Sequence, residues 1–191
     1  NLKKNKADFQ LITASENNAW LFNIRGRDSE YSPIPYCHVL IDRKKKIKFF
    51  CDIKKIPSSF KLHYKKIKFL NIDKISEILK DIYKKKFIID KNTCSIYLEK
   101  FISKNNKILQ FDDPIYGYKA VKNKVEISNI KKAHLLDGTA LTKYLFWVKK
   151  NFNKKKISEI SASDKLLKLR KKNQKFKFSS FPTISGAGPN G

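Results

Sequence analysis

Hydrophobic residues in the first 120 positions recur with two different periods, and each period predicts a different kind of element. Alternating apolar and polar residues, or short apolar runs rich in β-branched and aromatic side chains, indicate strands. The segments with this pattern are residues 8–14, 36–41, 47–51, 87–89 and 108–111, with 57–62 and 66–70 as weaker candidates. The lysine-rich turn before residue 47 predicts a hairpin with a charged, exposed tip.

Helical spacing appears between these strands. The segments that show it are residues 16–22, 74–83 and 96–102, and a short helix opened by Asp112-Asp113-Pro114. We predict caps at Asp73 for the second of these helices and at Asn92 or Thr93 for the third. Helices that alternate with strands predict an α/β fold, in which a mixed sheet is flanked by helices.

The composition shifts at residues 119–124, and the pattern beyond them differs from the first part of the chain. Residues 127–152 carry the longest amphipathic helix signal, and residues 158–173 predict a further helix capped by their first serine. The β-type residues 181–185 then predict a final strand, which leads into a Gly/Pro/Asn turn at 186–191.

These patterns predict two domains, residues 1–121 and 122–191, with the chain cut in mid-element. A strand followed by a turn normally pairs with a second strand, and no further strand follows this one. The sequence also begins with Asn1 and contains no methionine. We therefore expect a fragment of a longer protein, whose activity has to be assigned to fragment and parent separately.

The formal net charge of +26 is typical of proteins that bind nucleic acid or an anionic membrane. Two observations favour a solvated surface instead. Only four of the 43 basic residues are arginine, the side chain preferred for bidentate phosphate contacts, and the lysines spread from Lys3 to Lys177. Lys, Asn and Ile are also the residues that AT-rich codons encode. A polyanion-binding face is the alternative interpretation.

The three cysteines, Cys37, Cys51 and Cys94, are odd in number and form no C-x-x-C pair. This spacing excludes a zinc knuckle and argues against a disulfide framework, so we expect free buried thiols in a reducing compartment. No apolar run reaches the 18 to 20 residues of a membrane span, and no signal peptide is visible. The sequence leaves open whether a targeting segment preceded Asn1 and was removed.

No residue pattern in the chain predicts a catalytic site or a metal site. His38, His63 and His134 lie in unrelated elements and outside any metal-ligand spacing. His134 and Asp137 are one helical turn apart, which suits a shared polar site or, as we favour, a contact on the helix surface. The glycines and serine at 185–188 match neither a nucleophile elbow nor a phosphate-binding loop.

Four blocks of the sequence stand out: AWLFNIRGRD at 19–28, followed by Tyr31 and Pro33, IKKAHLLDGTAL at 130–141, ISEISASDKL at 157–166 and FPTISGAGPNG at 181–191. In this order, they closely resemble the Xaa-Pro aminopeptidases (aminopeptidase P, peptidase family M24) of the three-domain type. The resemblance implies that residues 1–121 form the middle, creatinase-N-like domain. Residues 122–191 would then be the first helices and strand of a truncated pita-bread (α+β) domain.

The resemblance also implies an activity for the parent protein. Members of this family are hydrolases that cleave the N-terminal Xaa-Pro peptide bond with two divalent metal ions, usually manganese. The ligands are two Asp, one His and two Glu that lie C-terminal to the block at 181–191, so we expect the fragment to contain no metal ligand and no catalytic residue, and to be inactive alone. Arg25, Asp28 and Tyr31 are candidates for a loop at the active-site mouth or at a subunit interface, with a solvated turn as the alternative.

The family implies a cytoplasmic homodimer that acts on peptides with proline at the second position, with neither nucleic acid nor membrane as a partner. Two alternatives belong to other functional classes. One is a pita-bread homologue that has lost its metals and serves as a binding module. The other is a basic nucleic-acid-binding protein, which the net charge would favour.

Overall fold

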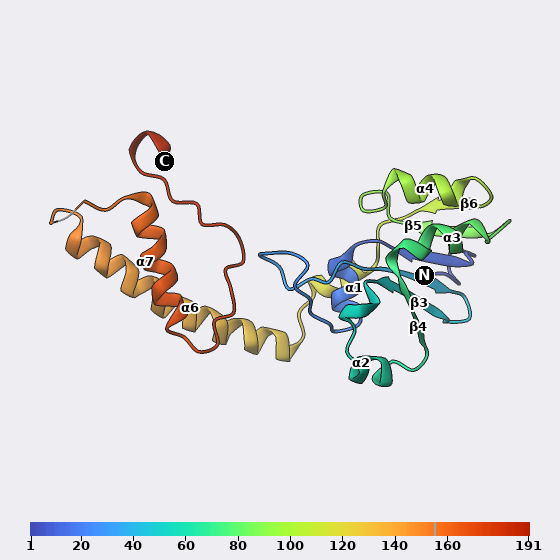
Figure 1. Cartoon of the computed structure of the whole chain (residues 1–191), viewed down its shortest axis with the longest axis horizontal. Coiled ribbons are helices and arrows are strands. Elements are labelled where there is room, and N and C mark those ends of the chain that lie inside the picture. The colour runs from blue at the N-terminus through green and yellow to red at the C-terminus, as the bar shows by residue number, and fades with distance from the viewer. Residues whose placement is uncertain (155) are drawn as a thin grey trace. The chain divides into compact units, whose positions relative to one another are not determined.

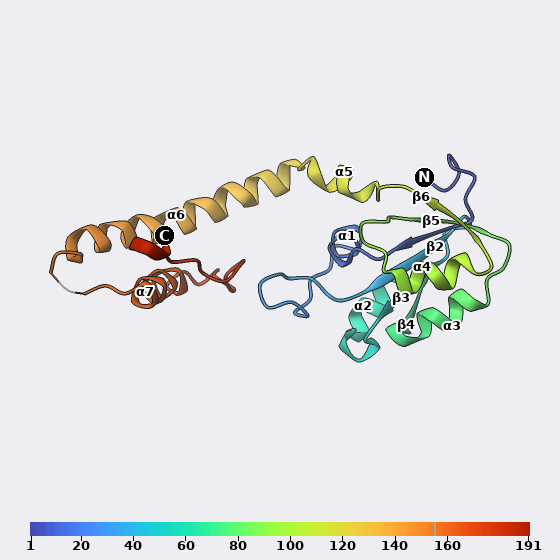
Figure 2. The ribbon, with the colours of Figure 1, turned by 90° about the horizontal axis from the view of Figure 1, so that it is seen from above.

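The computed structural model describes residues 1–154 and 156–191. The chain divides into two compact units, Asn1–Val121 and Lys122–Gly191 (Figures 1 and 2). The first unit combines a sheet with short helices, whereas the second contains two longer helices and a C-terminal segment. Each unit is therefore described by itself.

The first unit is built on one six-stranded sheet with the strand order β4-β3-β2-β1-β5-β6. Its strands are β1 Phe9–Ile12, β2 His38–Asp42, β3 Ile47–Cys51, β4 Ile67–Asn71, β5 Lys86–Ile89 and β6 Lys107–Gln110. Strand β2 is antiparallel to both of its neighbours, β1 and β3. The pairs β3 with β4, β1 with β5 and β5 with β6 are parallel. The predicted mixed sheet is thus confirmed.

Short helices cover both faces of this sheet. They are α1 Ser15–Leu21, α2 Ser58–His63, α3 Ile75–Lys80, α4 Ile96–Ser103 and α5 Ile115–Ala120, with 3₁₀ turns η1 Ile53–Lys55 and η2 Ile72–Lys74. On one face, α3 and α4 pack their apolar residues onto Leu11, Leu40 and Phe50. On the other face, Phe22 and Ile115 pack with strand residues that alternate with the first set. The α/β architecture of flanking helices therefore follows the predicted pattern.

The second unit contains α6 Lys124–Asn151 and α7 Glu159–Lys171, followed by the 3₁₀ turn η3 Gly188–Asn190. Asn123 and Glu126 form a capping box that starts α6. Ser158 caps α7, as its sequence predicts, by accepting from the N–H of Ser161. Arg170 of α7 donates two hydrogen bonds to Asp137 of α6, at 2.7 and 3.0 Å. The two helices are therefore joined by a polar contact on their surfaces.

The weaker strand prediction at residues 57–62 is wrong, because this segment forms helix α2. Its residues look strand-like in isolation, since Phe60 and Leu62 alternate with polar neighbours. In the helix, Phe60 and Tyr64 come to lie one turn apart with ring centroids at 4.7 Å, and Phe60 also contacts Phe69 of β4. Packing against the sheet decides the conformation here, and the sequence window alone does not contain that contact.

Both predicted caps of the first unit are corrected as well. Asp73 lies inside η2, and the residue at the start of α3 is Lys74, which makes no side-chain cap. Helix α4 is capped by Ser95, whose Oγ accepts from the N–H of Leu98 at 3.3 Å. Thr93 instead contacts Thr13, which follows the neighbouring strand β1, with 3.1 Å between their Oγ1 atoms.

The predicted final strand at 181–185 is also wrong, because these residues lie outside every helix and strand of the described chain. A β-type segment becomes a strand only when a neighbouring strand supplies hydrogen bonds. Here Glu159 Oε1 accepts from the N–H of Ala187 at 2.8 Å and from Asn190 Nδ2 at 3.1 Å, which ties the turn to the start of α7.

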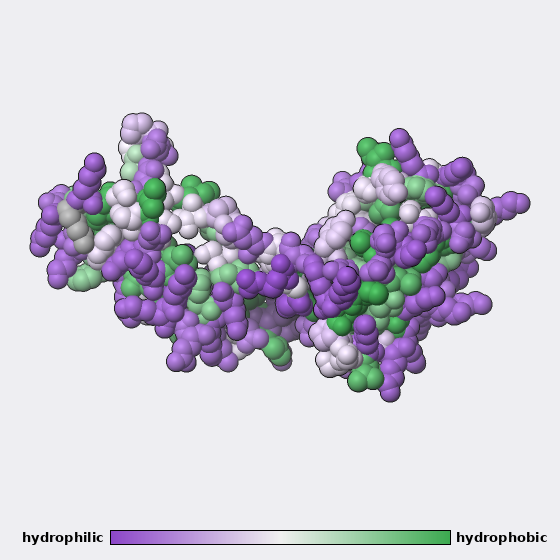
Figure 3. Space-filling view, viewed as in Figure 1, coloured by the Kyte–Doolittle hydropathy of each residue, from purple (hydrophilic) through white to green (hydrophobic). Residues whose placement is uncertain are grey.

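The surface is mainly hydrophilic, with hydrophobic patches between the charged side chains (Figure 3). Lysines line the outer positions of the sheet and the helices, as the composition leads one to expect. No helix in the described part of the chain is both long and apolar enough to cross a bilayer.

Candidate functional site

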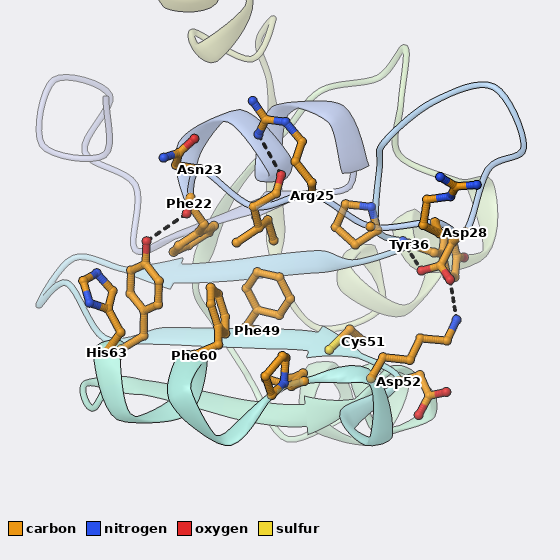
Figure 4. Close-up of a pocket in the computed structure, with 18 of the residues that line it drawn as sticks. Phe22, Asn23, Arg25, Asp28, Tyr36, Phe49, Cys51, Asp52, Phe60 and His63 are labelled. Carbon is orange, nitrogen blue, oxygen red and sulfur yellow. Dashed lines mark hydrogen bonds and ion pairs between the residues drawn. The ribbon is translucent and has the colours of Figure 1, made fainter. Parts of the chain in front are cut away.

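A cavity of about 900 Å³ lies within the first unit (Figure 4). Its walls come from the segment that follows α1, from β3, and from the η1 and α2 region. The lining includes Arg25 and Asp28, two of the three loop residues that the sequence singles out. Tyr31, the third, is not among the residues that line it. The structure therefore brings two of the three candidates to one site.

One wall of the cavity is aromatic. The ring of Phe22 meets Phe49 edge-on at 5.3 Å and Tyr64 edge-on at 5.9 Å. The hydroxyl of Tyr64 donates to the carbonyl oxygen of Phe22 at 2.8 Å, so this partly buried polar group is satisfied. Phe60, labelled in Figure 4, belongs to the same wall, and Ile56 also lines the cavity. Such a surface suits apolar or ring-shaped groups.

The opposite edge of the cavity is charged, and Asp28 is its organising residue. Its carboxylate accepts from the N–H of Tyr36 at 2.8 Å and forms an ion pair with Lys55 of η1. The hydrogen bond from Lys55 is the largest of the effects that hold the pKa of Asp28 below its usual value, followed by that from Tyr36. Asp28 thus fastens the loop before β2 to the turn after β3.

The other two candidates have local contacts. Arg25 donates to the carbonyl oxygen of its neighbour Ile24 at 2.8 Å, and its side chain is exposed at the cavity edge. A hydrogen bond with Glu30 raises the pKa of the Tyr31 hydroxyl above its usual value. These contacts are compatible with a surface loop that presents charged groups, and they leave the assigned role of the loop as a prediction.

Gly26 fixes the conformation of this loop. A Cβ placed on it would lie 2.6 Å from both the backbone nitrogen and the Cα of Pro35, which is closer than real Cβ contacts allow. The N–H of Gly26 donates to the carbonyl oxygen of Pro33 at 3.1 Å. The glycine therefore allows the two arms of the loop to touch, and it keeps Asp28 within reach of Lys55.

A buried polar network lies outside this cavity, between α1 and α5. Asn17 Nδ2 donates to Asp113 at 2.7 Å, and the N–H of Asp113 donates to Asp90 at 2.9 Å. At its edge, Tyr116 donates to Glu16 at 2.9 Å, and desolvation together with this bond raises the pKa of Tyr116 to about 12. These contacts join α1, β5 and α5, so we assign the network a structural role.

The described residues do not fit a dinuclear metal centre. Within 1–154 and 156–191, no group of three or more His, Cys, Asp or Glu side chains is placed to hold a metal ion. His38 Nδ1 lies 3.2 Å from the carbonyl oxygen of Thr13, and burial lowers its pKa. His63 stacks edge-on against Tyr64 at 4.6 Å, and His134 is exposed on α6.

Sequence reasoning missed three contributors to the cavity, Lys55, Phe60 and Tyr64. They lie more than 25 residues beyond Asp28, and no local spacing connects them with the loop. Their positions depend on the parallel pairing of β3 with β4, which brings η1 and α2 beside the loop. The only sequence signal was the cluster of aromatic residues near Phe60, which the strand interpretation assigned elsewhere.

Comparisons with known proteins show which family and which enzymes the chain resembles. The model of the creatinase/prolidase N-terminal domain matches residues 1–126. A probable Xaa-Pro aminopeptidase P of Phaeosphaeria nodorum is 32% identical over 208 residues, covering 100% of this chain and 31% of that protein. The Xaa-Pro aminopeptidase ApepP of Drosophila melanogaster is 33% identical over 199 residues, covering 100% of this chain and 32% of that protein.

A solved structure resembles the chain over nearly its whole length. The X-prolyl aminopeptidase of Caenorhabditis elegans, described as a cytosolic enzyme with a di-nuclear active site, matches with a TM-score of 0.85 and 25% identity. The match covers 96% of this chain and 31% of that one. The chain thus spans about a third of the length of the relatives that it matches.

Proposed function

The chain belongs to the creatinase/prolidase N-terminal domain family, and we propose that it is part of a metalloaminopeptidase that hydrolyses the N-terminal Xaa-Pro peptide bond. The observation that carries the proposal is the match of the whole chain, through both units, to Xaa-Pro aminopeptidases. Residues 1–121 are assigned to the middle, creatinase-N-like domain, and residues 122–191 to the first part of the pita-bread domain.

In this proposal the chain supplies scaffold and substrate-facing surface, and the metal ligands belong to the part of the longer protein that it does not span. The chain spans about a third of the length of the relatives that it matches, which supports this division. Two divalent ions, a homodimer and a cytoplasmic location are proposed for the complete protein. The description of the Caenorhabditis elegans enzyme as cytosolic and di-nuclear supports the metal number and the location. Manganese is proposed as the metal.

A chimera tests the activity. Residues 1–191 replace the matching third of the Drosophila enzyme, and hydrolysis of an Xaa-Pro peptide is measured with added manganese. We expect the chimera to hydrolyse the peptide and the isolated chain to show none. A folded, metal-loaded chimera without activity would contradict the proposal, and so would turnover by the chain alone. Circular dichroism and metal analysis establish folding and loading independently of activity.

The role of Arg25, Asp28 and Tyr31 is proposed as a loop at the active-site mouth or at the subunit interface. Substitution of Asp28 by Asn in the chimera releases the loop from Lys55. A raised KM at unchanged kcat supports the mouth, and dissociation of the dimer in sedimentation supports the interface. Asp81→Asn, at the exposed end of α3, is the matched control. If both variants behave like the parent chimera, the loop is only a solvated turn.

A further inference from the structure

Two of the three cysteines face each other across neighbouring strands. Strands β2 and β3 are antiparallel, with His38 opposite Phe50 as the last pair of the ladder. One further step in the same register places Cys37 opposite Cys51. Both thiols are free, they are 0% and 7% exposed, and both belong to the same apolar cluster. The register therefore brings two reduced cysteines together on one face of the sheet.

The hydrogen-bonding pattern at this position of the ladder favours a disulfide between the two cysteines. At the hairpin turn the N–H of Asp42 donates to the carbonyl oxygen of Lys46 at 3.1 Å, which marks a hydrogen-bonded pair. Such pairs alternate with non-hydrogen-bonded ones, so the pair of Cys37 and Cys51 is non-hydrogen-bonded, the type with Cα atoms about 4.5 Å apart. A disulfide requires a Cα separation of roughly 4.4 to 6.8 Å. The backbone geometry thus suits a bridge without rearrangement of the strands.

The backbone of Cys37 is also fixed in place. Its N–H donates to Ser15 Oγ at 3.2 Å, and its carbonyl oxygen accepts from Ser15 Oγ at 3.1 Å and from Asn18 Nδ2 at 3.2 Å. Cys51 is held from the other side by the ladder of β3 with β4, where it lies opposite Asn71. Helix α1 and strand β4 therefore hold the two cysteines at their positions in the register.

We propose that Cys37 and Cys51 are a modification site, which forms a reversible intramolecular disulfide on reaction with a low-molecular-weight disulfide. Cys51 lines the cavity and is the first to react (Figure 4). Its thiolate attacks the small disulfide, forms a mixed disulfide and releases one small thiol. The thiolate of Cys37 then attacks the sulfur of Cys51, which releases the second small thiol. The two cysteine protons end on the two small thiols, and their disulfide is reduced by two electrons.

The electrostatic surroundings make this a slow, pH-dependent reaction. Burial raises the pKa of Cys37 to about 12 and that of Cys51 to about 11, and the nearby Cys51 also contributes to the raised pKa of Cys37. The charged groups that act on Cys51 are Asp52 and Asp28, which raise its pKa, and Lys55 and Lys61, which lower it. Because the thiolate attacks, bridging should accelerate roughly tenfold per pH unit between 7 and 9.

The third cysteine provides an internal control. Cys94 is 8% exposed and belongs to the apolar cluster on the opposite face of the sheet. Burial raises its pKa to about 11, the same value as for Cys51. Cys51 and Cys94 therefore have similar burial and similar pKa values. They differ in that Cys51 lies opposite a cysteine on the neighbouring strand. A selective disulfide between Cys37 and Cys51 would therefore show that the register of β2 and β3 decides which cysteines react.

The test exposes the full chain of 191 residues to glutathione disulfide at pH 8.5, followed by alkylation of the remaining thiols in denaturant and digestion with trypsin. The three cysteines fall in separate peptides, 28–43, 49–54 and 92–100. We expect the first two to be recovered linked, with Cys94 alkylated, and dithiothreitol to reverse the link. Cys94→Ala should bridge like the unmodified chain, whereas Cys51→Ala should yield no intramolecular link.

The unfolded chain supplies the decisive comparison, and it does not depend on the folding of any variant. In denaturant all three pairings should form, whereas the folded chain should give one. Three alkylated thiols in the folded chain, or the same mixture of pairings in folded and unfolded chain, would overturn the proposal. A link that involves Cys94 in the folded chain would overturn it as well.

Discussion

Both units of the chain contain amphipathic helices, but they bury the apolar faces of these helices to very different extents. Nearly every buried apolar side chain in the described residues lies in Asn1–Val121, and the exceptions are Ala140 of α6 and Ala162 of α7. Large apolar residues of α6 remain exposed, including Leu135, Leu145 and Phe146. Helical periodicity thus predicts a helix without stating whether its apolar face is covered.

The sheet explains the difference. In the first unit, each short helix has a strand surface to pack on, so even the six residues of α3 contribute the fully buried Leu79. In the second unit, α6 and α7 have mainly each other, through the contact of Asp137 with Arg170 and of Lys165 with the ring of Trp147 at 5.2 Å. A long helix with strong caps can therefore be less buried than a short one on a sheet.

The largest expected effect is a difference between the two units in protease resistance and amide hydrogen exchange. Limited proteolysis should remove most of Lys122–Gly191 first and leave a resistant core from Asn1–Val121. Amide hydrogen exchange should be about a thousandfold slower in β1 and β5 than in α7, because opening α7 exposes little apolar surface. Mass spectrometry of the fragments and exchange by NMR measure both. A resistant core made of residues 125–191 would reverse the comparison.

The next largest difference is expected when one large side chain is truncated in each unit and the free energies of unfolding are compared. Phe87 is fully buried in β5 and stacks on Phe9 at 5.0 Å, so Phe87→Ala should lower the free energy of unfolding by about 3–5 kcal/mol. Leu145 of α6 is 57% exposed, so Leu145→Ala should change it by less than about 0.5 kcal/mol. Urea unfolding followed by fluorescence and circular dichroism measures both. Equal losses would show that α6 is covered in solution.

The comparison also shows which parts of the fold are predictable from the sequence. Strands β1, β3 and β5 carry alternating or continuous apolar residues, and a sheet uses that pattern directly. Residues 57–62 and 181–185 also look strand-like in the sequence. The first segment nevertheless packs on the sheet as α2, and the second has no neighbouring strand among the described residues. Tertiary contacts decide both cases, and these are not local in sequence.

The candidate site likewise has one part that is predictable from the sequence and one part that is not. The block at 19–28 identifies the loop that carries Arg25 and Asp28, because its residues are contiguous. The aromatic wall and Lys55 come from segments that are distant in sequence, and only the register of β3 and β4 brings them to the loop. The opposed cysteines follow the same rule, since their spacing of fourteen positions has meaning only once the hairpin register is known.

Gly26→Ala in the first unit and Gly138→Ala in the second should change the free energy of unfolding in opposite directions. Gly26→Ala forces a Cβ against the backbone of Pro35 and should destabilise the first unit by about 1–3 kcal/mol. Gly138 lies within α6 and a Cβ there would meet nothing within 4 Å, so Gly138→Ala should stabilise that helix by about 0.5–1 kcal/mol. Thermal unfolding measures the shifts. Gly117→Ala in α5 of the first unit is the matched control, because a Cβ there also meets nothing within 4 Å and the substitution should therefore not destabilise that unit.

The smallest expected effect is the coupling of Asp137 with Arg170 across the surfaces of α6 and α7. The pair is bidentate, but the Asp137 side chain is 48% exposed, so a double-mutant cycle with Asp137→Asn and Arg170→Met should give a coupling of about 0.2–1 kcal/mol. The coupling should fall in 1 M salt, because exposed charges are screened within about 3 Å at that concentration. A coupling that is larger and insensitive to salt would mean that the contact is buried in solution. The second unit would then resemble the first, with its helix faces covered.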